Sequence, residues 1–225
     1  MGLSTAVEDY AKAIYALEQR GERPVTTNAL AERLSVTAAS ASGMCKRLGE
    51  LGLVTHVPYK GVELTQAGER VALEVLRHHR LLELYLAERL DVPWDRVHDE
   101  AEVLEHVLSE ELEALIAAKL GHPTHDPHGD PIPSAKGKVA RRALTSLAKC
   151  DLGRPMRIAR VMDQNPQFLQ FADRHSLKPG TEVVVQSRDA VADAVAIHPR
   201  HHPSLTIGTA AAAKILVEAV QGTET

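Results

Sequence analysis

The feature that most constrains this chain is a row of four metal-capable side chains at helical spacing. His98 is followed by Glu102, Glu105 and His106, at steps of four, three and one residues. Positions i, i+4, i+7 and i+8 lie on one face of an α-helix. Two imidazoles and two carboxylates are costly to bury on one face unless something positive binds there. The row therefore predicts a helix that helps to hold a divalent cation.

The same row has a simpler interpretation, a solvated acidic face on an exposed helix, and its acidic neighbours Asp99 and Glu100 fit that view. Two observations favour a metal. Residues 76–121 carry 5 Lys or Arg against 11 Asp or Glu, a local balance that attracts cations. His79 and Glu83, four residues apart on the preceding helical stretch, could complete a coordination shell from a neighbouring helix.

Composition limits the class of protein. A chain of 225 residues that is 44% hydrophobic can form one large domain or two to three small ones. No run of 18 apolar residues exists, and the N-terminus lacks the features of a signal peptide. Cys45 and Cys150 are too far apart in sequence to indicate a disulfide framework. We therefore expect a cytoplasmic protein with no membrane partner.

The first third of the chain has the order of a winged helix-turn-helix. Apolar spacing predicts helices over 4–20 and 27–34, and a third that follows a tight connection at 35–37 and ends near Leu51. Residues 53–65 then predict a β-hairpin with Gly61 in its turn. Two short helices joined by about three residues form a helix-turn-helix, and the hairpin adds the wing.

The third helix has the composition of a recognition helix. Its first turns carry small and hydroxyl side chains, which let a helix approach closely in a major groove about 12 Å wide. Hydroxyl and basic groups can reach base edges and phosphates, although the basic pair alone is equally consistent with a solvated face. The DNA-contacting candidates are Thr37, Ala39, Ser40, Ser42, Lys46, Arg47 and, at the hairpin tip, Lys60.

The middle of the chain predicts two long helices, over 65–90 and from Pro93-Trp94 to about Leu120. Apolar residues on the second helix exceed what one small domain needs, which suggests a dimer seam; they include Leu104, Val107, Leu108 and Leu112. A Pro/Gly/His-rich loop over 122–135 precedes a basic stretch, Lys136 to Leu147, that we expect to be helical.

The last third changes to a β-rich pattern, with about five short strands and one short helix over 166–175. This pattern predicts a small β-barrel. The expected architecture is mainly α with a small β domain. Its parts are a winged helix-turn-helix (1–74), a helical metal-binding and dimerisation domain (75–140), a linker (141–150) and an SH3-like barrel (151–225).

Over nearly its full length the chain resembles the diphtheria toxin repressor family of metal-dependent transcriptional regulators. The stretches that carry the resemblance are Glu8-Asp9-Tyr10, Ala31-Glu32-Arg33-Leu34, His79-Arg80-Leu81, Pro93-Trp94, Val97-His98, Glu105-His106-Val107-Leu108-Ser109-Glu110 and Pro131-Ile132-Pro133. The last third is similar to the SH3-like, FeoA-like domain of the longer members.

The resemblance implies two metal sites per chain. The primary site would contain Asp9, Glu102, Glu105 and His106, and the ancillary site would contain His79, Glu83 and His98. In long members the third domain also supplies ligands. Those positions fall here on Arg160, which cannot bind metal, and on Asp163, which can.

Two residues bear on the choice of metal. The iron-sensing branch places sulfur donors at the positions of Asp9 and Glu102, whereas this chain has oxygen at both, as in the manganese-sensing branch. Carboxylate oxygens suit Mn²⁺. The manganese-sensing branch has a glutamate at the position of Lys12. A lysine ammonium there disfavours two closely bridged metal ions, so we expect two separated metal sites. Fe²⁺ is the alternative activator, and Zn²⁺ or Co²⁺ would be expected to bind in vitro.

The predicted function is a manganese-dependent repressor of metal uptake that binds a palindromic operator in double-stranded DNA as a homodimer; an iron(II)-dependent regulator is the alternative. Asp9 belongs to the DNA-binding head and Glu102 to the helical domain, so a metal held by both would fix the spacing of the two heads.

Two other classes remain open. A small metallohydrolase would use the same carboxylates and imidazoles, but the chain has no HExxH, nucleophile elbow or phosphate-binding glycine loop, so no enzyme is expected. A metal-independent DNA-binding protein would be insensitive to chelator. The loop histidines His125, His128, His201 and His202 are expected to be solvated.

Overall fold

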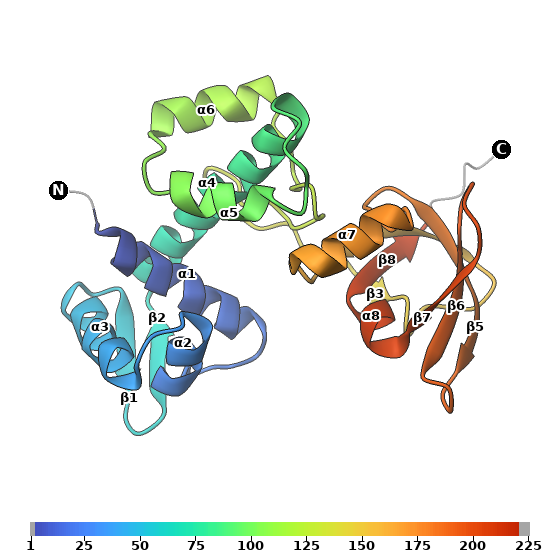
Figure 1. The fold of residues 1–225 in the computed structure, drawn as a ribbon. Coiled ribbons are helices and arrows are strands. Elements are labelled where there is room, and N and C mark those ends of the chain that lie inside the picture. Colours follow the sequence, from blue (N-terminus) through green and yellow to red (C-terminus); the bar gives the residue numbers. More distant parts are fainter. Residues whose placement is uncertain (1–2, 221–225) are drawn as a thin grey trace. The chain divides into compact units, whose positions relative to one another are not determined.

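The computed structural model describes residues 3–220 and divides them into two compact units (Figure 1). The first contains the chain up to His79, together with Glu102–Glu113 and Pro133–Val139. The second contains Arg80–Ala101, Ala114–Ile132 and the chain from Ala140 onward. The boundary lies between His79 and Arg80, within one continuous helix.

The first unit begins with the predicted winged helix-turn-helix. Its elements are α1 (Thr5–Gln19), α2 (Thr27–Arg33), α3 (Ala38–Glu50), β1 (Val54–Val57) and β2 (Gly61–Leu64). Thr37 caps α3 by accepting a hydrogen bond from the Ser40 amide, as Thr26 does for α2 from Ala29. The antiparallel hairpin pairs Val54 with Leu64. The element order predicted from sequence is therefore confirmed.

One apolar cluster holds these elements together. Ile14 of α1, Leu30 of α2 and Leu48 of α3 are completely buried in it, and Val62 joins it from the hairpin. Burial of such side chains contributes about 1.5–3 kcal/mol each. Val62 also exchanges backbone hydrogen bonds with Val25, which fixes the wing against the segment before α2. These contacts hold α3 and the hairpin in place within the winged helix-turn-helix (residues 5–64), which we call the head.

The helical part contains α4 (Gln66–Arg89), α5 (Val97–Leu104) and α6 (Glu110–Lys119). The predicted second long helix, 93–120, is wrong because the chain leaves the helix after Leu104. Ser109 explains the interruption: its carbonyl accepts from the Glu113 amide and its hydroxyl from the Leu112 amide, so it begins a new helix. Glu105 and His106 therefore lie in a turn and share no helix face with His98.

A second correction concerns the basic stretch Lys136 to Leu147, which is not helical. Ser134 and Lys138 close a tight turn in which Gly137 has a φ of +71°. The left-handed region is open to glycine at little cost and ends helical propagation. The first regular element after this turn is the short strand β3 (Thr145–Ser146).

The C-terminal part is a six-stranded antiparallel sheet in the order β3-β8-β4-β5-β6-β7. The remaining strands are β4 (Pro155–Val161), β5 (Glu182–Asp189), β6 (Ala194–Pro199), β7 (Leu205–Gly208) and β8 (Ile215–Ala219), with helices α7 (Pro166–Arg174) and α8 (Thr209–Ala213). Within residues 3–220, β3 and β7 are edge strands that do not pair with each other. The sheet is therefore open, and the closed barrel expected from sequence is not formed by hydrogen bonding.

A second apolar cluster lies in this unit and includes Ile158, Leu169, Ile197 and Ile215, all almost fully buried. Trp94, from the segment before α5, joins the same cluster. Among the helices described, none is long and apolar enough to cross a membrane. The boundaries predicted at residues 74, 140 and 150 stay predictions.

Candidate metal centres and nucleic-acid interface

The first unit brings α1 next to the turn that follows α5. Asp9 comes from α1, and Glu105 and His106 come from the turn; one donor atom of each lies within 4.8 Å of the others. His106 Nε2 is 3.0 Å from Asp9 Oδ1 and 3.4 Å from Glu105 Oε1, and His106 Nδ1 is 2.6 Å from Glu8 Oε2. We call Asp9, Glu105 and His106 the junction group. It joins the helix-turn-helix to the helical segment within one unit.

A second set of donors overlaps the junction group through Glu105. His79 on α4, Glu102 at the end of α5 and Glu105 form this set, again with donor atoms within 4.8 Å of one another. His79 Nδ1 is 2.5 Å from Glu105 Oε2 and 3.8 Å from Glu102 Oε1. The buried Glu105 belongs to both sets: its Oε1 lies 3.4 Å from His106 Nε2, and its Oε2 lies 2.5 Å from His79 Nδ1.

A lysine ammonium sits among the donors of this second set. Lys12, one turn after Asp9 on α1, donates hydrogen bonds to Glu102 Oε1 at 2.8 Å and to Glu105 Oε1 at 2.5 Å. Burial opposes its charge, but the Glu105 and Glu102 carboxylates more than compensate and raise the pKa of Lys12. The sequence singled out Lys12, and the structure shows which carboxylates it neutralises.

The chemistry of the junction group fits a hard divalent cation. Its donors are carboxylate oxygens and an imidazole, and Cys45 and Cys150 belong to neither set. Burial raises the pKa of Asp9, and the nearby Glu102 and Glu105 raise it further against the opposing effects of His106 and Lys12. A bound cation would relieve this repulsion between carboxylates.

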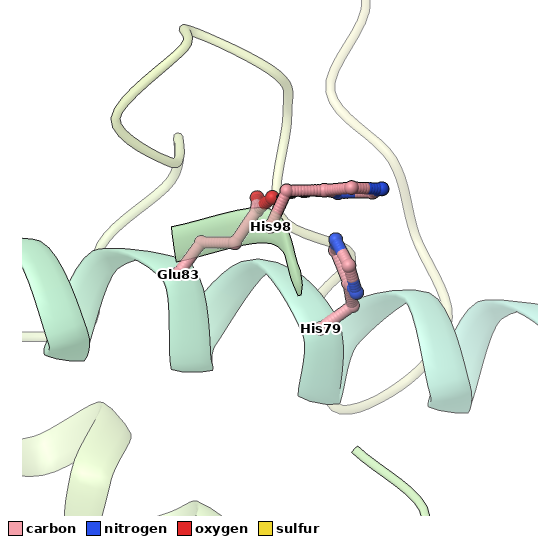
Figure 2. A group of neighbouring side chains, drawn as sticks. All are labelled: His79, Glu83 and His98. Carbon is pink, nitrogen blue, oxygen red and sulfur yellow. Dashed lines mark hydrogen bonds and ion pairs between the residues drawn. The ribbon is translucent and has the colours of Figure 1, made fainter. Parts of the chain in front are cut away.

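The predicted ancillary residues also lie close together. Figure 2 shows His79 and Glu83 on the same side of α4, with His98 reaching toward them from α5. His98 Nδ1 is 3.2 Å from Glu83 Oε1, and donor atoms of the three residues lie within 4.8 Å of one another. The row predicted on one helix face is thus split: His98 joins this group, while Glu105 and His106 join the junction group.

The structure adds a group that the sequence analysis missed. Glu83, Asp126 and His128 in the second unit are all buried and place donor atoms within 4.8 Å of one another. We call them the buried group. The expectation that His128 is solvated is wrong: its side chain is 0% exposed, stacks on Trp94 and lies 3.9 Å from Glu83 Oε2. The run Asp126-Pro127-His128 was a weak signal in sequence, because only the folded loop buries its Asp and His side chains.

A glycine makes this burial possible. Gly129 has a φ of +85°, and a Cβ there would lie 2.0 Å from the Ala159 carbonyl oxygen on β4. The same close approach lets the Val161 amide donate to the His128 carbonyl at 2.8 Å. The loop is therefore fixed to β4, and the His128 Nε2 atom lies 2.9 Å from the Trp94 carbonyl.

Charges around the buried group are partly balanced. Arg80 Nε lies 3.8 Å from Asp126 Oδ2, and both Arg80 and Arg160 pair with Asp130. Burial raises the pKa of Asp126 well above its usual value, and Asp130 and Glu83 add to the shift. Burial lowers the pKa of His128, but Glu83 more than reverses this and brings it to about 9. The group stabilises positive charge at His128.

The third-domain candidate lies elsewhere. Asp163 accepts hydrogen bonds from Lys214 Nζ at 2.5 Å and from the Asn165 amide at 3.0 Å. These bonds, chiefly the one from Lys214, outweigh burial and lower its pKa. None of the metal-capable groups found among residues 3–220 includes Asp163. Its role as a ligand stays a prediction. Arg160, the other position, forms an ion pair with Asp130.

The predicted DNA-contacting residues are all exposed on the head. Those on or before α3 are exposed, and Lys60 is exposed at the tip of the hairpin; the set is Thr37, Ala39, Ser40, Ser42, Lys46, Arg47 and Lys60. Cys45 is buried on the opposite side of α3. Tyr59, which the sequence analysis did not single out, is fully exposed beside Lys60 with a φ of +62°. A bulky residue in that conformation is uncommon, and here it lies in the turn between β1 and β2.

Large apolar side chains are exposed along α5, the turn and α6. Val103 is 73% exposed and Val107 78%, and Leu104, Leu112 and Leu115 are also exposed. Three of these were predicted for a dimer seam; the fourth, Leu108, is half-buried. Exposed apolar residues gathered in one stretch of chain are typical of protein–protein contacts.

Three family models match the chain in order. The iron dependent repressor N-terminal DNA binding domain matches residues 2–62, its metal binding and dimerisation domain matches 65–134, and the FeoA domain matches 145–219. The iron-dependent repressor IdeR of Mycobacterium bovis is 37% identical over 131 residues, a match that covers 58% of this chain and only 56% of that protein. IdeR of Mycobacterium leprae is 30% identical over 88% of this chain and 91% of its own length.

Solved structures give the same result over more of the chain. A manganese-dependent transcriptional repressor in complex with manganese superposes with a TM-score of 0.86 at 39% identity, covering 95% of this chain and all of that one. The manganese regulator SloR gives 0.74 at 33% identity, covering 95% and 98%. The chain therefore belongs to the diphtheria toxin repressor family, in the form that carries a C-terminal FeoA domain.

Proposed function

We propose that this protein is a manganese-dependent DNA-binding repressor that controls metal-ion uptake and homeostasis. The observation that carries the proposal is the junction group. Asp9 on the first helix of the DNA-binding head faces Glu105 and His106 on the turn after α5. Residues held together in this way can transmit occupancy of the site to the position of the head.

The proposed mechanism is a shift between head positions. Asp9, Glu105 and His106 of the junction group, with Glu102 as the fourth predicted ligand, would hold the ion, which adds positive charge to that already supplied by Lys12. Two heads in a homodimer must lie one helical turn, about 34–36 Å, or a multiple apart to bind a palindromic operator. Binding can favour that spacing only by the difference in metal affinity between the two states. The exposed apolar residues on α5 and α6 support the dimer.

The donor types support manganese over iron. Both groups at the junction contain only oxygen and nitrogen donors, which favours Mn²⁺ over more thiophilic ions. Two of the similar structures are named as manganese regulators. The curated relatives named IdeR support the alternative, an iron(II)-dependent regulator. Mn²⁺ binds most weakly in the Irving–Williams order, so activation, and not affinity alone, has to distinguish the metals.

For the second ion there are two candidate positions, and they share Glu83. One uses His79, Glu83 and His98, and the other is the buried group. Variants His98→Ala and His128→Gln separate them, because each removes an imidazole from one set alone. The variant that lowers the number of Mn²⁺ ions bound per chain identifies the occupied position.

DNA binding to genomic fragments, titrated with Mn²⁺, anaerobic Fe²⁺ and Zn²⁺ after chelation, tests the whole proposal. We expect binding that needs metal and responds most strongly to Mn²⁺. An equal response to Fe²⁺ at the same free concentration would select the iron-dependent alternative. Binding that is indifferent to chelator would leave a metal-independent winged-helix regulator.

A further inference from the structure

The ammonium of Lys12 occupies the middle of a donor set that could otherwise hold an ion. It lies 2.8 Å from Glu102 Oε1 and 2.5 Å from Glu105 Oε1, and its side chain is 16% exposed. His79 closes the same set through Glu105 Oε2 at 2.5 Å. The junction thus contains two overlapping donor sets, of which one surrounds a cation that belongs to the chain.

We infer that Lys12 is a fixed cation that takes the place of a second exchangeable ion at the junction and ties α1 to the α5 segment without metal. This inference rests on the proposed function for its link to DNA binding. Its structural basis is independent, because Lys12, Glu102 and Glu105 lie within one compact unit.

Charge and geometry both favour a single exchangeable ion. A divalent ion in the second set would need Glu102 Oε1, which already accepts a hydrogen bond from Lys12, and the Glu105 carboxylate, whose other oxygen also accepts from Lys12. It would also lie next to the ammonium, and the two positive charges would repel each other. The ion pairs of Lys12 are with Glu102 and Glu105, so Asp9 Oδ1 and His106 Nε2, which lie 3.0 Å apart, remain available to the first set.

Lys12 also connects parts of the metal-free protein. Lys12 is on α1 and both of its carboxylate partners lie at or beyond the end of α5, so these charge-assisted hydrogen bonds connect the head to the helical segment without an ion. The Glu105 carboxylate is also kept in place for Asp9 and His106. Metal binding would then strengthen a connection between α1 and the α5 segment that Lys12 already makes.

The test counts ions and measures metal-free DNA binding in the full chain. Lys12→Glu replaces the ammonium with a donor, and Lys12→Gln removes the charge alone; Lys138→Gln, an exposed lysine of the same unit, is the matched control. We expect Lys12→Glu to bind one more Mn²⁺ per chain than wild type and to show the low-temperature EPR spectrum of an exchange-coupled Mn²⁺ pair. Wild type and Lys138→Gln should show no coupled pair.

Lys12→Gln should lower DNA binding by the chelated protein several-fold and require more Mn²⁺ to restore it. Thermal unfolding of each variant distinguishes these effects from loss of the fold. A coupled pair in wild type, or an unchanged ion count in a folded Lys12→Glu protein, would overturn the inference. The proposed function fails in a different assay, if wild-type DNA binding does not respond to metal at all.

Discussion

The junction group and the buried group contain the same kinds of side chain in opposite environments. Asp9 and His106 are only partly buried and join a DNA-binding head to a helical segment, with Lys12 supplying a fixed charge beside them. Glu83, Asp126 and His128 are buried completely or almost so and are surrounded by Arg80, Trp94 and β4. The junction group suits an exchangeable ion whose binding changes how the head is held against the helical segment. The buried group suits a permanent charge that fixes the loop carrying Asp126 and His128.

The largest effect is expected at the junction. Asp9→Ala removes the donor that α1 contributes to the junction group, so we expect metal binding to lose its effect on the position of the head. Metal-activated DNA binding should fall by roughly 5- to 150-fold, the usual range for coupling between sites. Titration of DNA binding with Mn²⁺ measures this. Asp9 is partly exposed, so the melting temperature of the chelated protein should hardly change. A variant that still responds fully to Mn²⁺ would contradict the role given to the junction.

Gly129→Ala should show the opposite behaviour. The added Cβ would lie 2.0 Å from the Ala159 carbonyl oxygen in a left-handed conformation, so the loop that carries Asp126 and His128 must move. We expect a loss of unfolding free energy of about 3 kcal/mol, measured by denaturant unfolding of the chelated protein. Gly121→Ala, also at positive φ but with nothing within 4 Å, is the control for backbone strain alone. If both variants lose the same stability, the contact with β4 is not what fixes the loop.

The buried group should also make stability depend on pH. His128 has a folded-state pKa of about 9, above its usual 6.5, so its protonated form favours the fold. The contribution is therefore complete below pH 6.5 and is lost as pH rises through 9; at about 1.4 kcal/mol per pKa unit it is at most roughly 3.5 kcal/mol. The raised pKa of Asp126 acts in the same direction. Melting temperatures of chelated protein between pH 6 and 9.5 should fall, and His128→Gln should flatten the fall.

The smallest effect is expected at the wing tip, which belongs to neither group. Lys60→Gln should reduce the salt dependence of DNA binding by a slope of about 1 if Lys60 contacts one phosphate. Tyr59→Ala should weaken binding several-fold at constant salt, because its exposed ring loses a contact with DNA. Both variants should keep the full ratio of affinities with and without Mn²⁺. A change in that ratio would mean that the wing takes part in switching.

The sequence was most informative where local chemistry decides the structure. Apolar spacing placed the elements of the head to within one or two residues, because caps such as Thr37 and glycines such as Gly61 act locally. It failed at Ser109, where a side chain begins a new helix inside an apolar pattern that looks continuous. It failed again at His128, because the burial of a loop histidine depends on β4, about 30 residues further along the chain.

The sequence by itself therefore determined the winged helix-turn-helix, the residue types of the metal-capable groups and the oxygen donors at positions 9 and 102. The family resemblance had already grouped Glu105 with Asp9 and His98 with Glu83. Only the tertiary structure decided that Glu105 is shared with His79, that Lys12 contacts Glu102 and Glu105, and that His128 is buried. The physical reason is the range of each interaction. Periodicity and capping act over one or two helical turns, whereas a coordination shell is assembled from donors up to about a hundred residues apart, whose meeting depends on how the helices and the sheet pack.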